Sequence, residues 1–348
     1  MEKFPGRIVL LLLCLVLSGC AKAETAQPAT EPTQAAAHTQ PVTEPVMEVV
    51  TAPVTEPATE PSTMNVEAEA EAMEEAPPPP VAVVLEAEAP GELEERCDVA
   101  VIDYSNTQDG YVMVRYLVPS ESRLKVLVNG PDTKYSYNLP VDEWTVFPLS
   151  DRNGTYQIGV YQNISGTKYA KVLAAETEVN MTDEFAPFLR PNQYVNYTEA
   201  TLAVSKGLEI TADYEAPLDK VAAVYDYVVS NLSYDHDRAA TVKSGYIPDL
   251  DQVLEEKKGI CFDYAALMTA MLRSQQIPCK MVFGYAGSVY HAWISVWTED
   301  SGWVDGVIFF DGVAWKRLDP TFASTENQSD SIMNYINNNS NYQEKYFY

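Results

Sequence analysis

The chain has 348 residues and is strongly acidic, with 50 Asp and Glu residues against 23 Lys and Arg and a formal net charge of −27 at pH 7. This charge argues against nucleic acid or an anionic lipid surface as a partner of the folded part. The sequence also contains no Gly-rich phosphate loop and no paired metal-ligand motif, so we expect no metal site.

The first 19 residues have the features of a lipoprotein signal peptide. Charged residues precede an apolar run at positions 8–17, which is too short to cross a bilayer as a stable helix. The sequence Leu-Ser-Gly-Cys at positions 17–20 fits a lipobox, where bacterial lipoproteins are cleaved and lipidated. We therefore expect lipidation at Cys20 and a lipid-anchored protein on the extracytoplasmic side of a bacterial membrane. An ordinary secretory signal or a truncated anchor is the alternative.

Residues 20–96 have the composition of a disordered tether. Thr-Glu-Pro occurs four times, Glu alternates with Ala around positions 67–75, and four prolines follow at 77–80. Such a segment buries too little apolar surface to offset the entropy cost of ordering it.

Residues 97–182 are predicted to form a small antiparallel β-sandwich, for which an Ig-like topology is one option. Short β-like runs recur about every ten residues and are separated by Asn, Asp, Gly and Pro. The runs lie at 99–102, 111–117, 124–128, 144–147, 154–161 and 171–173. A spacer role is favoured over a substrate-binding or wall-binding role, and both stay open.

Residues 183–348 contain three segments that bear chemistry. Apolar residues at helical spacing predict an amphipathic helix from Cys261 to about residue 276. Alternation predicts a strand at 291–297 that begins with His291, and a short β-like run precedes Asp319. Further strands are predicted at 279–283, where Cys279 would be buried, and at 346–348.

The order Cys261, His291, Asp319 is that of a candidate nucleophilic triad. A thiol attacks an acyl carbon as the thiolate, so it needs an imidazole partner and an electropositive setting. The N-terminus of a helix supplies positive potential at Cys261. A strand would hold His291 over that helix end, and Asp319 would fix the imidazole tautomer.

The motifs around these residues resemble the core of the transglutaminase-like superfamily. They are Gly-Ile-Cys-Phe-Asp-Tyr-Ala-Ala-Leu at 259–267, His-Ala-Trp at 291–293 and Leu-Asp-Pro-Thr at 318–321, and the resemblance covers about residues 195–348. It implies an α+β, papain-related domain with Cys261 as nucleophile, His291 as general base and acid, and Asp319 as orienting carboxylate. The backbone N–H of Cys261 and the phenol of Tyr234 would hold the oxyanion.

Several alternatives remain open within this resemblance. Asp300, Asp305 or Asp311 could replace Asp319, although only Asp319 has the Leu-Asp-Pro-Thr context.

The substrate would be a protein, a peptide or a cell-wall peptide, and the attacking group in the second step would be water or an amine. We favour hydrolysis, because water needs no acceptor site. The alternative from another class is an inactive binding or structural lipoprotein. No cofactor is implied by a thiol–imidazole pair.

The cysteine count predicts little cross-linking. After processing, Cys97, Cys261 and Cys279 would remain, too few for a disulfide scaffold. A bridge between Cys97 and Cys279, or an inhibitory bridge to Cys261, stays open.

Overall fold

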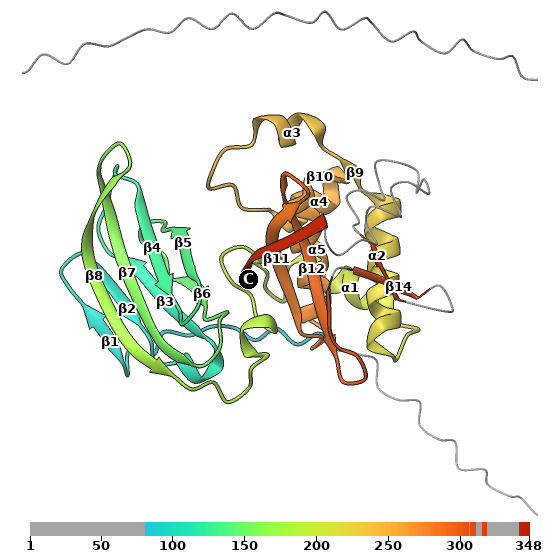
Figure 1. Cartoon of the computed structure of the whole chain (residues 1–348), viewed down its shortest axis with the longest axis horizontal. Helices are drawn as coiled ribbons and strands as arrows, with labels where there is room; N and C mark the ends of the chain where they lie inside the picture. The colour runs from blue at the N-terminus through green and yellow to red at the C-terminus, as the bar shows by residue number, and fades with distance from the viewer. Residues whose placement is uncertain (1–80, 306, 311–314, 319–340) are drawn as a thin grey trace, which may run out of the picture. The chain divides into compact units, whose positions relative to one another are not determined.

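The computed structural model describes residues 81–305, 307–310, 315–318 and 341–348 (Figure 1). All of them belong to one compact unit, Glu74–Tyr348. Cys20, the signal peptide and Asp319 lie outside the described residues. Among the described residues, no helix combines the length and the apolar character that a membrane span requires.

The N-terminal part is a β-sandwich of two four-stranded antiparallel sheets (Figure 1). The first sheet has the order β1 (Glu94–Arg96), β2 (Ala100–Asp103), β3 (Tyr111–Tyr116) and β6 (Thr145–Pro148). The second has the order β5 (Lys134–Asn138), β4 (Leu124–Asn129), β7 (Gly154–Ser165) and β8 (Lys168–Val179). The predicted antiparallel sandwich is confirmed, and an Ig-like topology stays a prediction.

Two strands of the sandwich, β1 and β5, were not predicted from the sequence. The strand β5 reads Lys-Tyr-Ser-Tyr-Asn, in which only Tyr135 and Tyr137 are apolar, yet both are fully buried. The strand β1 lies within the predicted tether. Upstream of it, the backbone N–H of Val83 donates to the carbonyl of Ser274 at 2.8 Å, and the side chains of Ala82 and Val84 pack against the core. The predicted tether therefore extends too far, because these few apolar residues dock onto the folded part.

The C-terminal part is an α+β domain, as predicted. Its sheet has the order β13 (Gly302–Asp305), β12 (Val289–Thr298), β11 (Cys279–Ala286) and β16 (Tyr342–Phe347). Its helices are α1 (Leu202–Thr211), α2 (Pro217–Asn231), α3 (His236–Thr241), α4 (Leu250–Glu256) and α5 (Cys261–Arg273). Short elements complete it: β9 (Ser233–Tyr234), β10 (Lys258–Gly259), β14 (Val307–Phe310), β15 (Trp315–Leu318) and a 3-10 turn at Ala186–Phe188. A further 3-10 turn at Thr107–Asp109 lies in the sandwich between β2 and β3.

The helix α5 is the centre of this domain. Every residue after Cys261, from Phe262 to Arg273, is buried. The helix packs against α1, α2 and α4 and also against β11 and β12 (Figure 1). A helix that is covered on all sides forms part of the core rather than the surface. It ends at Arg273, three residues before the predicted end. At Gln276 the backbone adopts a positive φ of 60° and turns toward β11.

The strand β12 confirms the predicted strand at 291–297, but its burial does not alternate. All residues from His291 to Val296 are buried. Ala292 and Ile294 belong to the core cluster that contains α5, whereas the Trp293 ring on the other face lies 5.4 Å from the ring of Tyr342 in β16. Both faces of this central strand are therefore covered.

Candidate active site

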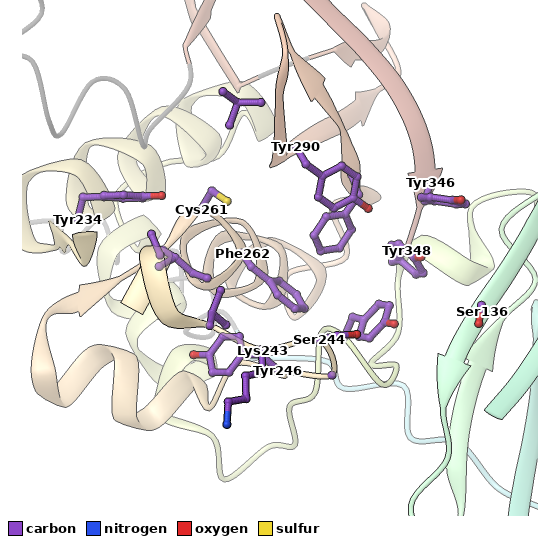
Figure 2. A pocket seen from close by; sticks show the side chains of 17 residues that line it. Ser136, Tyr234, Lys243, Ser244, Tyr246, Cys261, Phe262, Tyr290, Tyr346 and Tyr348 are labelled. Carbon is purple, nitrogen blue, oxygen red and sulfur yellow. The ribbon is translucent and has the colours of Figure 1, made fainter. Parts of the chain in front are cut away.

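Cys261 is the first residue of α5 and is half-buried. Its thiol opens onto a cavity of about 610 Å³ (Figure 2). The backbone N–H groups of a first helical turn have no partner within the helix and create a positive potential there. The sequence prediction that Cys261 begins a helix is confirmed, and this position suits a thiolate and a nearby oxyanion.

Tyr234 lines the same cavity because two short strands bring it beside the start of α5. The strands β9 and β10 pair in parallel, with Tyr234 opposite Gly259. The backbone N–H of Asp235 donates to the carbonyl of Gly259 at 2.8 Å. Figure 2 shows the Tyr234 hydroxyl directed toward the side of the cavity where Cys261 lies. The structure thus brings these two predicted residues together, and the oxyanion role of Tyr234 stays a prediction.

His291 lies in β12 opposite Gly284, and only 5% of its surface is exposed. Its ring stacks on Trp293, with ring centroids 6.2 Å apart. The preceding residue, Tyr290, lines the cavity with Cys261, whereas His291 is not among the described residues that line it. The strand β12 packs against α5, and direct pairing of Cys261 with His291 stays a prediction.

The candidate carboxylates are only partly described. Asp319 and Asp311 lie outside the described residues. Asp300 is in the turn after β12, and Asp305 ends β13 opposite Ser295 of β12. The choice of Asp319 as the orienting acid therefore rests on its sequence context.

Asp263 is a site residue that the sequence reasoning missed. It is fully buried, and it accepts hydrogen bonds from the Tyr246 hydroxyl at 2.6 Å and from the backbone N–H of Ile260 at 2.7 Å. Arg238 approaches it at 3.5 Å. Burial raises the pKa of Asp263, and these three partners oppose that rise by stabilising the carboxylate. An acid at the third position of a predicted helix is a capping signal that could have revealed it.

The contact between Asp263 and Ile260 explains the glycine two residues before the nucleophile. A Cβ atom on Gly259 would lie 2.7 Å from Cβ of Asp263, closer than such atoms approach in proteins. Gly259 therefore lets the Asp263 carboxylate fold back onto the backbone that precedes Cys261. This arrangement holds the start of α5 in place.

The other thiols differ from Cys261. Cys279 is fully buried, as predicted, and burial raises its pKa to about 11. Its Sγ donates to Thr269 Oγ1 at 3.6 Å. Cys97, Cys261 and Cys279 are all free thiols, so neither of the two bridges left open above is formed. Within the described ranges, no group of three or more His, Cys, Asp or Glu side chains is arranged to hold a metal ion.

Comparison with known proteins places this site in a recognised domain. The model of the transglutaminase-like superfamily matches residues 205–305. The match contains Tyr234, Cys261 and His291 and ends before Asp319.

The chain is 32% identical over 188 residues to the uncharacterised protein YebA of Bacillus subtilis, covering 46% of this chain and 24% of YebA. It is 32% identical over 133 residues to the uncharacterised protein ML0607 of Mycobacterium leprae, covering 35% of this chain and 44% of ML0607. The chain thus spans less than half of the length of either relative.

Among solved structures, a proposed cysteine protease from Cytophaga hutchinsonii is similar at 14% identity and a TM-score of 0.35, covering 68% of this chain and 76% of that one. The periplasmic domain of TgpA from Pseudomonas aeruginosa is similar at 16% identity and a TM-score of 0.28, covering 60% and 93%. Both TM-scores lie below 0.5, and the family match alone identifies the domain. Residues 205–305 of this chain form a transglutaminase-like domain.

Proposed function

We propose that this chain is an extracytoplasmic cysteine enzyme of transglutaminase-like type that cleaves an amide or peptide bond. The observation that carries the proposal is the position of Cys261, which begins the buried helix α5 and opens onto a cavity. A thiol at a helix N-terminus is favoured as the thiolate.

The proposed reaction has two steps and needs no cofactor. Cys261 Sγ attacks the amide carbonyl while His291 takes the thiol proton, and His291 then gives that proton to the leaving amine, which leaves a thioester. In the second step His291 takes a proton from water, the hydroxide attacks the thioester, and the acid and the thiol are released. Asp319 would orient the imidazole, and the N–H of Cys261 and the hydroxyl of Tyr234 would hold the oxyanion in each step.

Hydrolysis is favoured over crosslinking because water needs no dedicated acceptor site. An amine acceptor in the second step would instead make the protein a transglutaminase. The substrate would be a protein, a peptide or a cell-wall peptide. An inert scaffold is the competing function. The reactivity of Cys261 toward an alkylating reagent distinguishes an enzyme from such a scaffold.

We also propose that the protein is anchored to the membrane through a lipid on Cys20. The lipobox at positions 17–20 and the Thr-Glu-Pro repeats that follow it support this location. Globomycin treatment of expressing cells, which blocks the lipoprotein signal peptidase, would leave the full-length precursor. A mature N-terminal peptide that begins at Cys20 and carries no lipid by mass spectrometry would contradict the lipid anchor.

The enzymatic proposal is tested by the rate of iodoacetamide alkylation of each cysteine against pH, read by mass spectrometry of the tryptic peptides. We expect Cys261 to react fast well below the pKa of about 8.5 of a free thiol. The His291→Ala variant should lose this fast reaction. Cys279 is the internal control and should stay unlabelled in the folded protein, since it is fully buried and its pKa is about 11.

The opposite result has a clear meaning. If Cys261 reacts slowly and at the same rate in the His291→Ala variant, its thiol is not activated. The protein would then be a binding or structural lipoprotein that uses the transglutaminase-like fold as a scaffold.

A further inference from the structure

One side of the cavity beside Cys261 is built from aromatic rings. This aromatic wall comprises Tyr194, Phe262, Phe283, Tyr290, Tyr346 and Tyr348. Figure 2 labels four of them, namely Phe262, Tyr290, Tyr346 and Tyr348. The rings of Phe262 and Phe283 meet edge to face at 4.9 Å, and Tyr290 stacks on Phe283 at 5.8 Å with an interplanar angle of 11°. Aromatic rings packed in this way form a rigid apolar surface.

The mouth of the cavity exposes apolar side chains to solvent. Val289 is 60% exposed and Tyr290 is 52% exposed at the tip of the β11–β12 hairpin, and Val242, which follows α3, is 39% exposed. All three line the cavity. Grouped exposed apolar residues around a concave surface mark a binding site, because leaving them in water costs free energy unless a ligand covers them.

The charge of the lining argues for an uncharged ligand group. Lys243 is the only charged side chain among the described lining residues, and Figure 2 shows its amino group directed away from the aromatic wall. A carboxylate or ammonium group placed against the aromatic wall would lose hydration without gaining an ionic partner there. An apolar side chain would gain about 25 cal/mol for each Å² that it buries.

We propose that this cavity is a substrate subsite that takes an aromatic or large aliphatic side chain of a peptide, next to the amide that Cys261 attacks. The inference rests on the proposed function for its position beside the scissile bond. The volume of about 610 Å³ exceeds one aromatic side chain, so the subsite also has room for the adjoining backbone. Polar cell-wall peptides and glycans are disfavoured by the same lining.

The test separates binding from turnover. N-acetyl-phenylalaninamide and N-acetyl-glutamate amide, which have side chains of similar length, are titrated into the full-length Cys261→Ala protein and followed by calorimetry. We expect the phenylalanine ligand to bind at least about tenfold tighter, which is about 1.4 kcal/mol. In the wild-type protein the same ligand should slow the alkylation of Cys261, which locates it beside the thiol.

A matched pair of variants assigns the effect to the wall. Tyr290→Ala removes an exposed ring of the wall and should weaken binding of the phenylalanine ligand about threefold to tenfold. Tyr285→Ala is the control, since Tyr285 is 38% exposed on the same hairpin, contacts Tyr290 at 5.5 Å and does not line the cavity. It should leave binding unchanged.

The outcomes distinguish the two proposals. Equal binding of both ligands, or tighter binding of a muropeptide, would overturn the apolar subsite even if Cys261 is an activated thiolate. Selective binding of the phenylalanine ligand that protects Cys261 would support the subsite even if alkylation shows an ordinary thiol, in which case the cavity would be a peptide-binding site without catalysis.

Discussion

Gly259 and Asp263 show how single residues shape the site around the nucleophile. The Asp263 carboxylate reaches back to the N–H of Ile260 and passes over Gly259, where a side chain has no room. The two residues therefore act together on the backbone that leads into Cys261. Neither is predicted to touch the substrate, so both are positioning residues.

The first prediction at this scale concerns Gly259→Ala. The added methyl should push Asp263 away from Ile260, which loses a buried hydrogen bond and destabilises the fold by about 1–3 kcal/mol. The displaced helix start should also slow the alkylation of Cys261. Urea unfolding and residue-specific alkylation measure the two effects.

The control for this variant is Lys258→Ala at the preceding position. Lys258 makes an ion pair of 3.2 Å with Asp235, and its side chain is 42% exposed. The Asp235 side chain is only 10% exposed, but it also accepts from the backbone N–H of Arg238 at 2.9 Å. Removing the partly exposed Lys258 should therefore change neither measurement appreciably. A Gly259→Ala protein with unchanged stability and unchanged thiol reactivity would show that Asp263 does not position Cys261.

Among the helices and strands, Arg273 connects the end of α5 to three other segments through hydrogen bonds. Its guanidinium is fully buried and donates to the carbonyls of Cys279 at 2.7 Å and 2.9 Å, Arg190 at 2.7 Å and Tyr348 at 2.6 Å. These carbonyls belong to the start of β11, the segment before α1 and the residue after β16. One side chain therefore supplies donors to backbone carbonyls of three segments, and the Tyr348 carbonyl also accepts from the backbone N–H of Met281 at 2.9 Å.

The second prediction is that Arg273→Met destabilises the fold by about 2–5 kcal/mol. Methionine has a similar length, so the loss comes from the missing hydrogen bonds to three carbonyls rather than from a cavity. Urea unfolding followed by circular dichroism gives the free energy. Arg152→Met is the control, because Arg152 pairs with Asp132 on the surface and should be replaceable without measurable change. Equal stability of both variants would contradict the structural role of Arg273.

At the scale of the whole molecule, buried tyrosines join the sandwich to the C-terminal domain. Tyr348 contacts the rings of Tyr135 and Tyr137 in β5 at 5.6 Å and 5.7 Å and the ring of Tyr194 at 4.7 Å. Burial is the main reason why the pKa of each of these tyrosines is raised. The pKa of Tyr194 rises to about 12, and the pKa values of the other three rise further. The fold therefore holds them as neutral phenols.

The third prediction is a loss of stability in alkali. The unfolded chain releases its tyrosine protons near pH 10, whereas the folded chain keeps them, so the unfolded state binds fewer protons and stability falls as pH rises above about 10. Each such group contributes up to about 1.4 kcal/mol per pH unit until its folded pKa is reached. Stability below about pH 9 should not change through these groups.

Two measurements check this prediction together. Urea unfolding at increasing pH gives the stability, and ultraviolet absorbance of the phenolate counts the ionised tyrosines. We expect part of the phenolate signal to appear only with unfolding. Full ionisation of all 22 tyrosines in a still-folded protein would contradict the burial described above.

Local sequence patterns predicted the elements that carry the chemistry. Cys261 as the start of a helix, His291 within a strand, and the buried Cys279 all followed from apolar periodicity and from the motifs. Local patterns suffice there, because each depends on residues within one helix or strand.

The support of the site depends on contacts between distant segments, which local patterns did not predict. The pairing of Tyr234 with Gly259, the burial of β5 and the docking of Val83 onto Ser274 join segments far apart in the chain, and short or weakly apolar segments have no periodic signal of their own. The same holds for the aromatic wall, whose rings come from the segment before α1, from α5, β11, β12 and β16, and from the residue after β16. Which distant segments pack together depends on the fit of their shapes and on hydrogen bonds to buried polar groups. The spacing of apolar residues within one segment does not reveal either of these.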